Sequence, residues 1–203
     1  MEAVGTIRGT MAPLPRANVD TDQIIPKQFL KRVERTGFGE FCFYDWARDA
    51  EGELDASFVL NRPEYASARV LVTGPNFGSG SSREHAPWAL QDRGFAAVVA
   101  PSFADIFRTN CHKNGLLPVV LTTGEVDELT RIATADPAAV VEIDLAAQTV
   151  TAPGFAASFA IDPFVKHCLL EGLDDIGLTL EHEDSIAAFE ATRPDHKPSL
   201  IRR

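Results

Sequence analysis

The sequence predicts an α/β fold built around a mixed β-sheet. From residue 69 onward, short apolar runs alternate with longer amphipathic stretches, a pattern typical of strands joined by crossover helices. Two later apolar runs, 139–145 and 149–160, favour shorter strands paired as a hairpin. With 203 residues, of which 45% are hydrophobic, the chain can bury one good core.

The first part of the chain is expected to be less regular than the rest. Residues 4–10 favour an opening strand, and residues 28–33 favour one or two helical turns. The following stretch is interrupted by residues that break helices and strands, so it is predicted to be mostly loop. These residues are Gly37, Gly39, Gly52 and Pro63.

The remaining elements follow from hydrophobic periodicity. The predicted strands are 69–73, 95–100, 116–121, 139–145 and 149–160. The predicted helices are 83–93, 103–113, 126–133, 163–171, 173–180 and 184–192. We expect residues 1–193 to form a single domain and residues 194–203 to form an exposed C-terminal tail.

Charge and composition exclude several classes of partner. The 29 acidic and 19 basic residues give a formal net charge of -10, which argues against binding to nucleic acid. A small anion remains compatible with this charge, because a few arginines can create a local positive pocket. No apolar run approaches the ~18 residues needed to cross a bilayer, so no membrane association is expected.

The cysteines and the N-terminus indicate the cellular compartment. The three cysteines, Cys42, Cys111 and Cys168, are odd in number and widely spaced, so they do not suggest a disulfide framework. Residues 1–6 lack the charged and apolar regions of a secretory signal. We therefore expect a cytoplasmic protein.

The most informative segment is the glycine-rich stretch 74–90. It connects a predicted strand to a predicted helix and ends in Ser81, Ser82 and Arg83. Backbone N–H groups and the dipole at a helix N-terminus favour a bound anion, whereas an arginine there is unfavourable for the helix and suggests another task. The alternative is structural, because Ser81 and Glu84 have the spacing of a capping box.

Three familiar functional motifs do not fit this stretch. A dinucleotide fingerprint requires a glycine where Arg83 stands, and a P-loop requires a lysine that the stretch lacks. A nucleophile elbow requires glycines two positions on either side of a serine, and no serine of the stretch has them. Neither a nucleotide-binding fold nor a serine hydrolase is supported.

Residues 76–86, Asn-Phe-Gly-Ser-Gly-Ser-Ser-Arg-Glu-His-Ala, resemble the signature of the aconitase-type swivelling domain. Further matching segments lie at 18–26, 35–39, 102–107, 114–118 and 171–176. Together they resemble the small subunits of bacterial 3-isopropylmalate dehydratases, from the first strand to about residue 190. The resemblance implies a three-layer β/β/α swivelling domain with a mixed sheet, as in the C-terminal domain of aconitase.

The resemblance also implies roles for four residues. Ser81 would be the base that removes a proton from the carbon beside a carboxylate, acting as a stabilised alkoxide. Ser82 would donate a hydrogen bond to the substrate or to the oxyanion. Arg83 would bind a substrate carboxylate with its two-pronged guanidinium. Arg16 would belong to the same pocket, although without the resemblance a surface arginine would be the favoured interpretation.

Removing hydroxide from a malate requires a strong Lewis acid. The five histidines and three cysteines show no metal-ligand spacing, and the adjacent pairs Cys111-His112 and His167-Cys168 are interpreted as packing or surface residues. No metal is therefore expected on this chain. The resemblance implies a [4Fe-4S] cluster carried by a partner, the large subunit.

Substrate choice is assigned, from the resemblance, to a loop spanning residues 30–43. Leu30, Val33, Phe38 and Phe41 could line an apolar wall for an isopropyl group. Alternatively, they are core residues, or the loop is ordered only by the partner. His85 and Glu84 are expected to brace the loop and helix, and Asp20 and Asp22 to be structural, with a possible role in orienting Arg16.

The resemblance therefore implies that this chain is the small subunit of a hydro-lyase. With its large subunit it would interconvert 2-isopropylmalate and 3-isopropylmalate through the alkene, in leucine biosynthesis. A related dicarboxylate hydro-lyase acting on citraconate, dimethylmalate or homoaconitate is an alternative. A non-catalytic anion-binding module is another.

Overall fold

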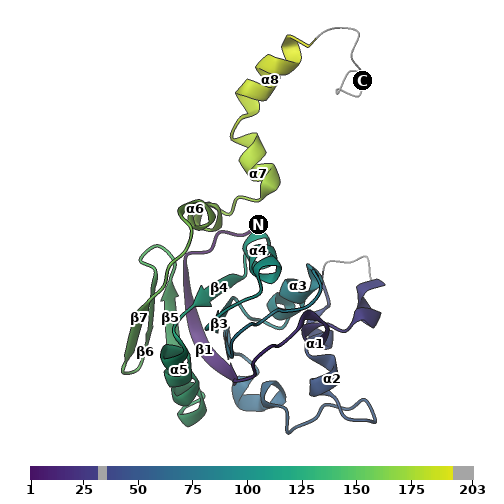
Figure 1. Cartoon of the computed structure of the whole chain (residues 1–203), viewed down its shortest axis with the longest axis vertical. Coiled ribbons are helices and arrows are strands. Elements are labelled where there is room, and N and C mark those ends of the chain that lie inside the picture. The colour runs from purple at the N-terminus through teal and green to yellow at the C-terminus, as the bar shows by residue number, and fades with distance from the viewer. Residues whose placement is uncertain (32–35, 194–203) are drawn as a thin grey trace.

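The computed structural model describes residues 1–31 and 36–193, and its centre is a mixed sheet (Figure 1). Seven strands of the described chain form this sheet in the order β4-β3-β2-β1-β5-β6-β7. Strands β1 to β4 are parallel, whereas β5, β6 and β7 are antiparallel. The bounds are β1 (Thr6–Leu14), β2 (Val70–Thr73), β3 (Ala97–Ala100), β4 (Leu117–Val120), β5 (Val140–Asp144), β6 (Thr149–Ala152) and β7 (Phe155–Ser158). The predicted α/β fold with a mixed sheet is confirmed.

The helices connect these strands or follow them. They are α1 (Thr21–Ile24), α2 (Tyr44–Ala47), α3 (His85–Asp92), α4 (Asp105–Asn114), α5 (Thr123–Ala135), α6 (Pro163–Glu171), α7 (Asp175–Leu180) and α8 (Glu183–Ala191). Short 3₁₀ helices lie at Lys27–Lys31, Gly39–Phe41, Val59–Asn61 and Pro63–Tyr65. In its described residues, 15–31 and 36–69, the connection between β1 and β2 is thus irregular apart from short helical turns, as its glycines predict.

The sheet separates two apolar cores. Because side chains alternate along a strand, Leu71 of β2 faces one core while its neighbours Val70 and Val72 face the other. The first core contains the buried faces of α3 and α4 together with the β1–β2 connection, and the second contains α5. All four residues of β2 are buried, which explains why its sequence reads as a continuous apolar run.

Several element boundaries differ from the prediction for identifiable reasons. Strand β1 extends to Leu14 because it pairs with β2 along that extension. The predicted strand 149–160 is divided by a turn at Gly154, whose φ of +72° ends β6 and starts β7. Helix α5 begins earlier than expected because Thr122 and Glu125 form a capping box.

Helices α7 and α8 form an arm, residues 175–191, that leads away from the sheet (Figure 1). Neither helix contributes a buried residue within the described chain. The predicted C-terminal tail, residues 194–203, lies outside the described residues. The arm is therefore the part of the described structure that depends least on the two cores.

The loop after β2 is held close to two other segments. Phe77 is fully buried and packs edge-on against Phe107 of α4, with ring centres 5.4 Å apart. The N–H of Gly78 donates to the carbonyl of Val19 at 2.7 Å. Gly78 has a φ of +77°, and a Cβ at this position would come within 2.1 Å of Phe107. Only glycine fits, both for its backbone conformation and for the close approach of the ring.

Gly78→Ala is expected to destabilise the fold by about 3 kcal/mol, because a strained backbone is combined with overpacking. Gly154→Ala is the matched control, since Gly154 has a similar φ of +72° but no atom within 4 Å of its added Cβ. It should cost only about 1 kcal/mol. Urea unfolding of both variants measures the difference, and equal losses would show that the contact with Phe107 contributes nothing.

Candidate active site

The candidate site lies where two loops meet at one edge of the sheet. Strands β1 and β2 are parallel neighbours, so their carboxyl ends lie at the same edge. The segments that follow them, 15–25 and 74–84, are joined by backbone hydrogen bonds. Asn18 N–H donates to Pro75 O at 2.9 Å, and Thr21 N–H donates to Ser79 O at 2.8 Å. Residues far apart in sequence are therefore held together by backbone geometry.

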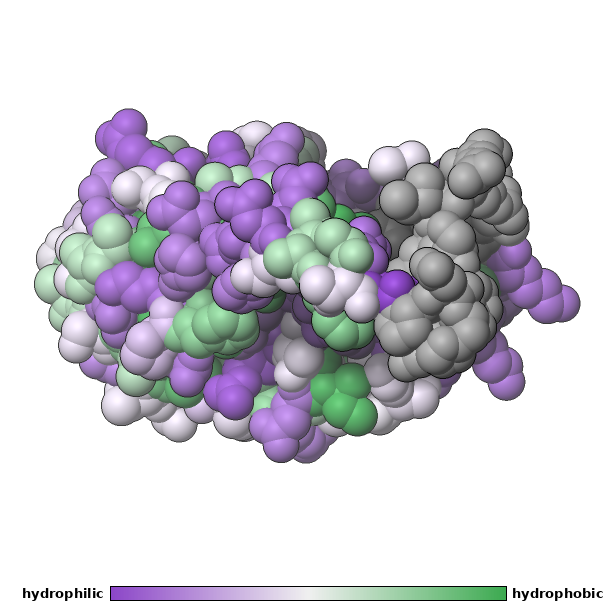
Figure 2. Space-filling view, turned by 90° about the horizontal axis from the view of Figure 1, so that it is seen from above, coloured by the Kyte–Doolittle hydropathy of each residue, from purple (hydrophilic) through white to green (hydrophobic). Residues whose placement is uncertain are grey.

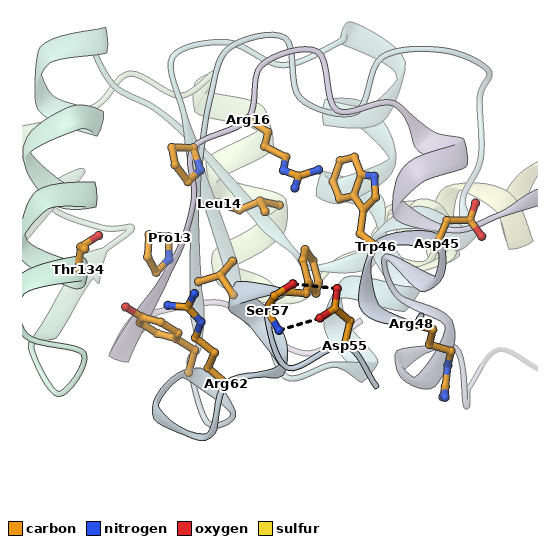
Figure 3. Close-up of a pocket in the computed structure, with 14 residues that line it drawn as sticks. Pro13, Leu14, Arg16, Asp45, Trp46, Arg48, Asp55, Ser57, Arg62 and Thr134 are labelled. Carbon is orange, nitrogen blue, oxygen red and sulfur yellow. Dashed lines mark hydrogen bonds between the residues drawn. The ribbon is translucent and has the colours of Figure 1, made fainter. Parts of the chain in front are cut away.

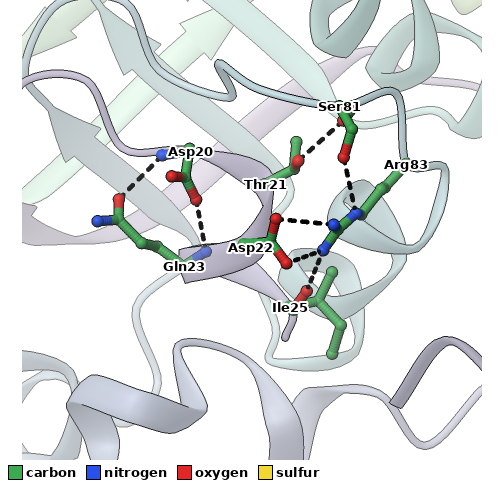
Figure 4. A network of polar contacts seen from close by, with 7 residues as sticks. All are labelled: Asp20, Thr21, Asp22, Gln23, Ile25, Ser81 and Arg83. Atoms are coloured by element: carbon green, nitrogen blue, oxygen red, sulfur yellow. Dashed lines mark hydrogen bonds and ion pairs between the residues drawn. The ribbon is translucent and has the colours of Figure 1, made fainter. Parts of the chain in front are cut away.

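Arg83 connects the two loops through its guanidinium group (Figure 4). Nη1 and Nη2 donate to the two carboxylate oxygens of Asp22 at 2.5 and 2.7 Å, and Nη1 also donates to the carbonyl of Ile25 at 3.2 Å. The side chain of Arg83 is only 12% exposed, whereas that of Asp22 is 53% exposed. The guanidinium is thus fixed in a two-pronged carboxylate contact, the geometry that favours arginine over lysine.

Ser81 occupies the opposite side of the same guanidinium. Nε of Arg83 donates to Ser81 Oγ at 3.1 Å, and the Ser81 carbonyl accepts from Thr21 Oγ1 at 2.8 Å. Both Ser81 and its neighbour Ser82 are exposed. A hydroxyl that is open to solvent and touches a fixed cation can be approached by a ligand, and a negative charge on its oxygen would be stabilised.

The capping-box alternative for Ser81 is not observed. Helix α3 begins at His85, and its N-cap residue Glu84 makes no side-chain capping hydrogen bond within the described chain. A capping box does form elsewhere, between Asp20 and Gln23 of α1. Asp20 is therefore structural, as expected, and it fixes the first turn of the helix that carries Asp22.

Asp22 pairs with Arg83, whereas the sequence had suggested a role in orienting Arg16. The guanidinium carbon of Arg16 lies 4.2 Å from the centre of the Trp46 ring, a cation–π contact (Figure 3). Trp46 is in turn stacked on the buried ring of Phe43. In the described residues, the structure brings Ser81 and Arg83 into one network and places Arg16 in a neighbouring pocket.

The pocket lined by Arg16 and Trp46 has a volume of about 670 Å³ and lies beside the end of β1. Its polar lining includes two further arginines, Arg48 and Arg62, and two carboxylates, Asp45 and Asp55. The Asp55 carboxylate is already occupied by the N–H and hydroxyl of Ser57, which lower its pKa. Sequence reasoning overlooked Trp46 because an isolated tryptophan carries no motif.

The loop assigned to substrate recognition is only partly described. Phe38 is fully buried, its N–H donates to the Asp92 carboxylate at 2.8 Å, and its ring packs edge-on against His85. Phe38 therefore occupies the core, the alternative considered for it above. Leu30 is partly buried against the same core, and Val33 lies outside the described residues. Phe41 stacks on Phe29 at 4.1 Å between ring centres.

His85 packs between Phe38 and Trp88, and burial lowers its pKa. A neutral imidazole wedged among aromatic rings suits a bracing role. Glu84 accepts a hydrogen bond from the side-chain amide of Asn114 at 3.4 Å, which links the start of α3 to the end of α4.

Burial shifts the pKa values of Cys42, of Cys111 and of His112, which follows Cys111 in the sequence. Burial raises the pKa of Cys42 to about 12 and that of Cys111 well above its usual value, so both are protonated thiols. Burial lowers the pKa of His112 to about 4. The described residues contain no group of three or more His, Cys, Asp or Glu side chains placed to hold a metal ion.

Among the same residues, every helix is too short or too polar to span a bilayer.

Comparison with known proteins identifies the family. The model of the aconitase C-terminal domain matches residues 1–124. A model named LeuD_N matches residues 127–163, and the C-terminal domain of the 3-isopropylmalate dehydratase small subunit matches residues 175–202. A 3-isopropylmalate dehydratase small subunit from Paramagnetospirillum magneticum is 56% identical, covering 98% of this chain and all of the relative. The chain belongs to the 3-isopropylmalate dehydratase small-subunit family.

Other members of this family agree in length and fold. The small subunit from Rubrobacter xylanophilus is 52% identical, covering 99% of this chain and 100% of its own. The crystal structure of a 3-isopropylmalate dehydratase (leuD) from Methanocaldococcus jannaschii superposes with a TM-score of 0.66 at 26% identity, covering 91% of this chain and 99% of that one. The family and fold predicted from the sequence are confirmed.

Proposed function

We propose that this chain is the small subunit of a cytoplasmic 3-isopropylmalate dehydratase. With a large subunit it would interconvert 2-isopropylmalate and 3-isopropylmalate by dehydration and rehydration, in leucine biosynthesis. The observation that carries the proposal is the contact of the Arg83 guanidinium with both Ser81 Oγ and a carboxylate, in a chain of this family. A base and a carboxylate anchor on one loop suit a substrate whose acidic proton lies beside a carboxylate.

In this proposal Ser81 is the base. A serine hydroxyl is a weak acid, so its alkoxide needs a fixed positive charge at hydrogen-bond distance. The Nε–H of Arg83, 3.1 Å from Ser81 Oγ, provides that charge. Because Ser81 is exposed, its oxygen can reach a proton on a bound substrate. The adjacent hydroxyl of Ser82 would donate a hydrogen bond to the substrate.

Arg83 has the second task of binding a substrate carboxylate. The guanidinium already donates hydrogen bonds to both oxygens of one carboxylate, that of Asp22. We propose that the substrate carboxylate exchanges with Asp22, which is half exposed and can turn toward water. The charge balance around the guanidinium is preserved in this exchange.

The remaining contacts complete the proposed site. Arg16, held over Trp46, would bind the second carboxylate. The loop 30–43 would contact the isopropyl group through residues such as Leu30 and Val33, while Phe38 supports the loop from the core. A [4Fe-4S] cluster on the large subunit would supply the Lewis acid that hydroxide departure requires.

Ser81→Ala should abolish turnover while leaving assembly with the large subunit intact. General-base catalysis is worth roughly 10²–10⁴-fold, and the variant should lose at least that much in kcat. Ser79→Ala, in the same loop, is the matched control and should stay within about threefold of the wild type. The measurement is the rate of the reconstituted enzyme. Near-normal rates for Ser81→Ala would remove Ser81 as the base.

Arg83→Lys should lower kcat/KM by about 100-fold or more, because lysine cannot form the two-pronged carboxylate contact. Arg131→Lys is the matched control: Arg131 also contacts a carboxylate, that of Glu128, with two nitrogens, but it lies on the exposed face of α5. The control should be unaffected. Steady-state kinetics over a range of isopropylmalate concentrations distinguishes the two, and equal effects would contradict a carboxylate-binding role.

A non-catalytic anion-binding module would make a different prediction for the isolated chain. In our proposal the isolated chain binds isopropylmalate weakly, with a dissociation constant above about 1 mM, because Asp22 occupies the guanidinium of Arg83. Asp22→Ala should tighten that binding by freeing the guanidinium. Titration calorimetry on both proteins measures this. Micromolar binding by the wild-type chain alone would favour the binding module.

A further inference from the structure

The arm, residues 175–191, presents large apolar side chains to solvent. Ile176 and Leu180 of α7 are 70% and 57% exposed, and Ile186 and Phe189 of α8 are 37% and 68% exposed. Each pair is spaced by three or four residues, so its members share one face of their helix. Large apolar side chains exposed on two successive helices are typical of an interaction surface.

The arm also lacks the means to be stable alone. Helices α7 and α8 have 6 and 9 residues, shorter than the ~12–15 residues that an isolated helix needs in water. Within the described chain neither helix buries a residue against the two cores. Packing against another molecule would supply the missing burial.

The surface of the arm continues toward the active site. A groove of about 710 Å³ runs between α4 and the helices α6 and α7. Ile176 and Leu178 of the arm line it, together with Phe164, which is 61% exposed, and Glu84. Glu84 is the neighbour of Arg83 in sequence. A molecule that covers the arm and fills this groove would therefore reach the loop that carries Ser81 and Arg83.

The charge of the arm indicates what kind of molecule would cover the arm and the groove. In residues 174–193 the basic side chain is Arg193, and the acidic ones are Asp174, Asp175, Glu181, Glu183, Asp184 and Glu190. Two of these carboxylates already pair within the chain, Asp175 with Lys113 and Asp174 with the N-terminal amine. Figure 2, which views the molecule from the end where the arm projects, shows apolar patches set among hydrophilic residues. A second copy of this chain would bring two acidic arms together, which is unfavourable. A partner with an apolar groove bordered by lysine and arginine is complementary.

We propose that the arm and the groove between α4 and the helices α6 and α7 form the docking surface for the large subunit. This inference rests on the proposed function, which requires a large subunit to complete the site next to Arg83. The arm coincides with the separate C-terminal family model, which begins at residue 175. Docking at the arm places the partner along a path from α8 to the active-site loop.

The test measures binding of the full-length chain to the large subunit of the same organism, its cluster reconstituted under anaerobic conditions. The double variant Ile176→Ser/Phe189→Ser should weaken this binding by at least about 30-fold, the effect expected of central interface residues. Leu54→Ser is the matched control, because Leu54 is 62% exposed but lies outside the arm and groove. It should bind like the wild type. The double variant should keep the wild-type melting temperature and regain full kcat at saturating large subunit.

The outcomes separate this inference from the proposed function. Wild-type binding with an unaffected double variant would overturn the docking surface and leave the function standing. No binding of the wild-type chain would overturn both. A wild-type chain that light scattering shows to be a dimer, and that the double variant converts to a monomer, would make a second copy the occupant and overturn the inference. Ser81→Ala serves as a protein that binds normally but does not turn over.

Discussion

The parallel pairing of β1 with β2 is the constraint on which the candidate site depends. Met11 to Leu14 align with Val70 to Thr73, so both strands end at the same edge of the sheet. The chain needs the long connection from residue 15 to residue 69 to return for this pairing. The loops that leave the shared edge are then close enough for Arg83 to reach Asp22, a residue 61 positions earlier. A different strand order would separate Ser81 and Arg83 from Thr21 and Asp22, the residues of the other loop that they contact.

The Asp22–Arg83 pair shows how an acidic chain maintains a positive site. The Arg83 side chain is only 12% exposed, and a charge that has lost much of its hydration is costly without a partner. Asp22 provides that partner from a carboxylate that is itself half exposed. Exchange for a substrate carboxylate would keep the guanidinium paired throughout, so neither state leaves a buried charge alone. The net charge of -10 is therefore compatible with binding a dicarboxylate.

The helices and strands could be predicted from the sequence because buried elements have a recognisable local pattern of apolar residues. Strands such as Val70–Thr73 are buried on both sides and read as apolar runs, and the glycine-rich loop has a distinctive composition. Contacts between residues far apart in the sequence have no such local pattern. The pairing of Asp22 with Arg83 and the stacking of Arg16 on Trp46 depend on tertiary geometry. Local information was overlooked at Thr122 and Glu125, whose spacing indicates a capping box.

The exposure of Ser81 connects the chemistry to assembly. An alkoxide is stabilised by a nearby cation much more strongly in a dry site than in water, because the effective dielectric constant falls. In the isolated chain Ser81 and Ser82 are exposed, so water reaches the oxygen atom that accepts the hydrogen bond from Arg83. A large subunit that docks along the arm and groove would exclude water from the same loop. Assembly would then do more than bring a metal close to the substrate. If Ser81 is the base, as we propose, assembly would also stabilise its alkoxide form, because the contact with Arg83 would then act in a drier environment.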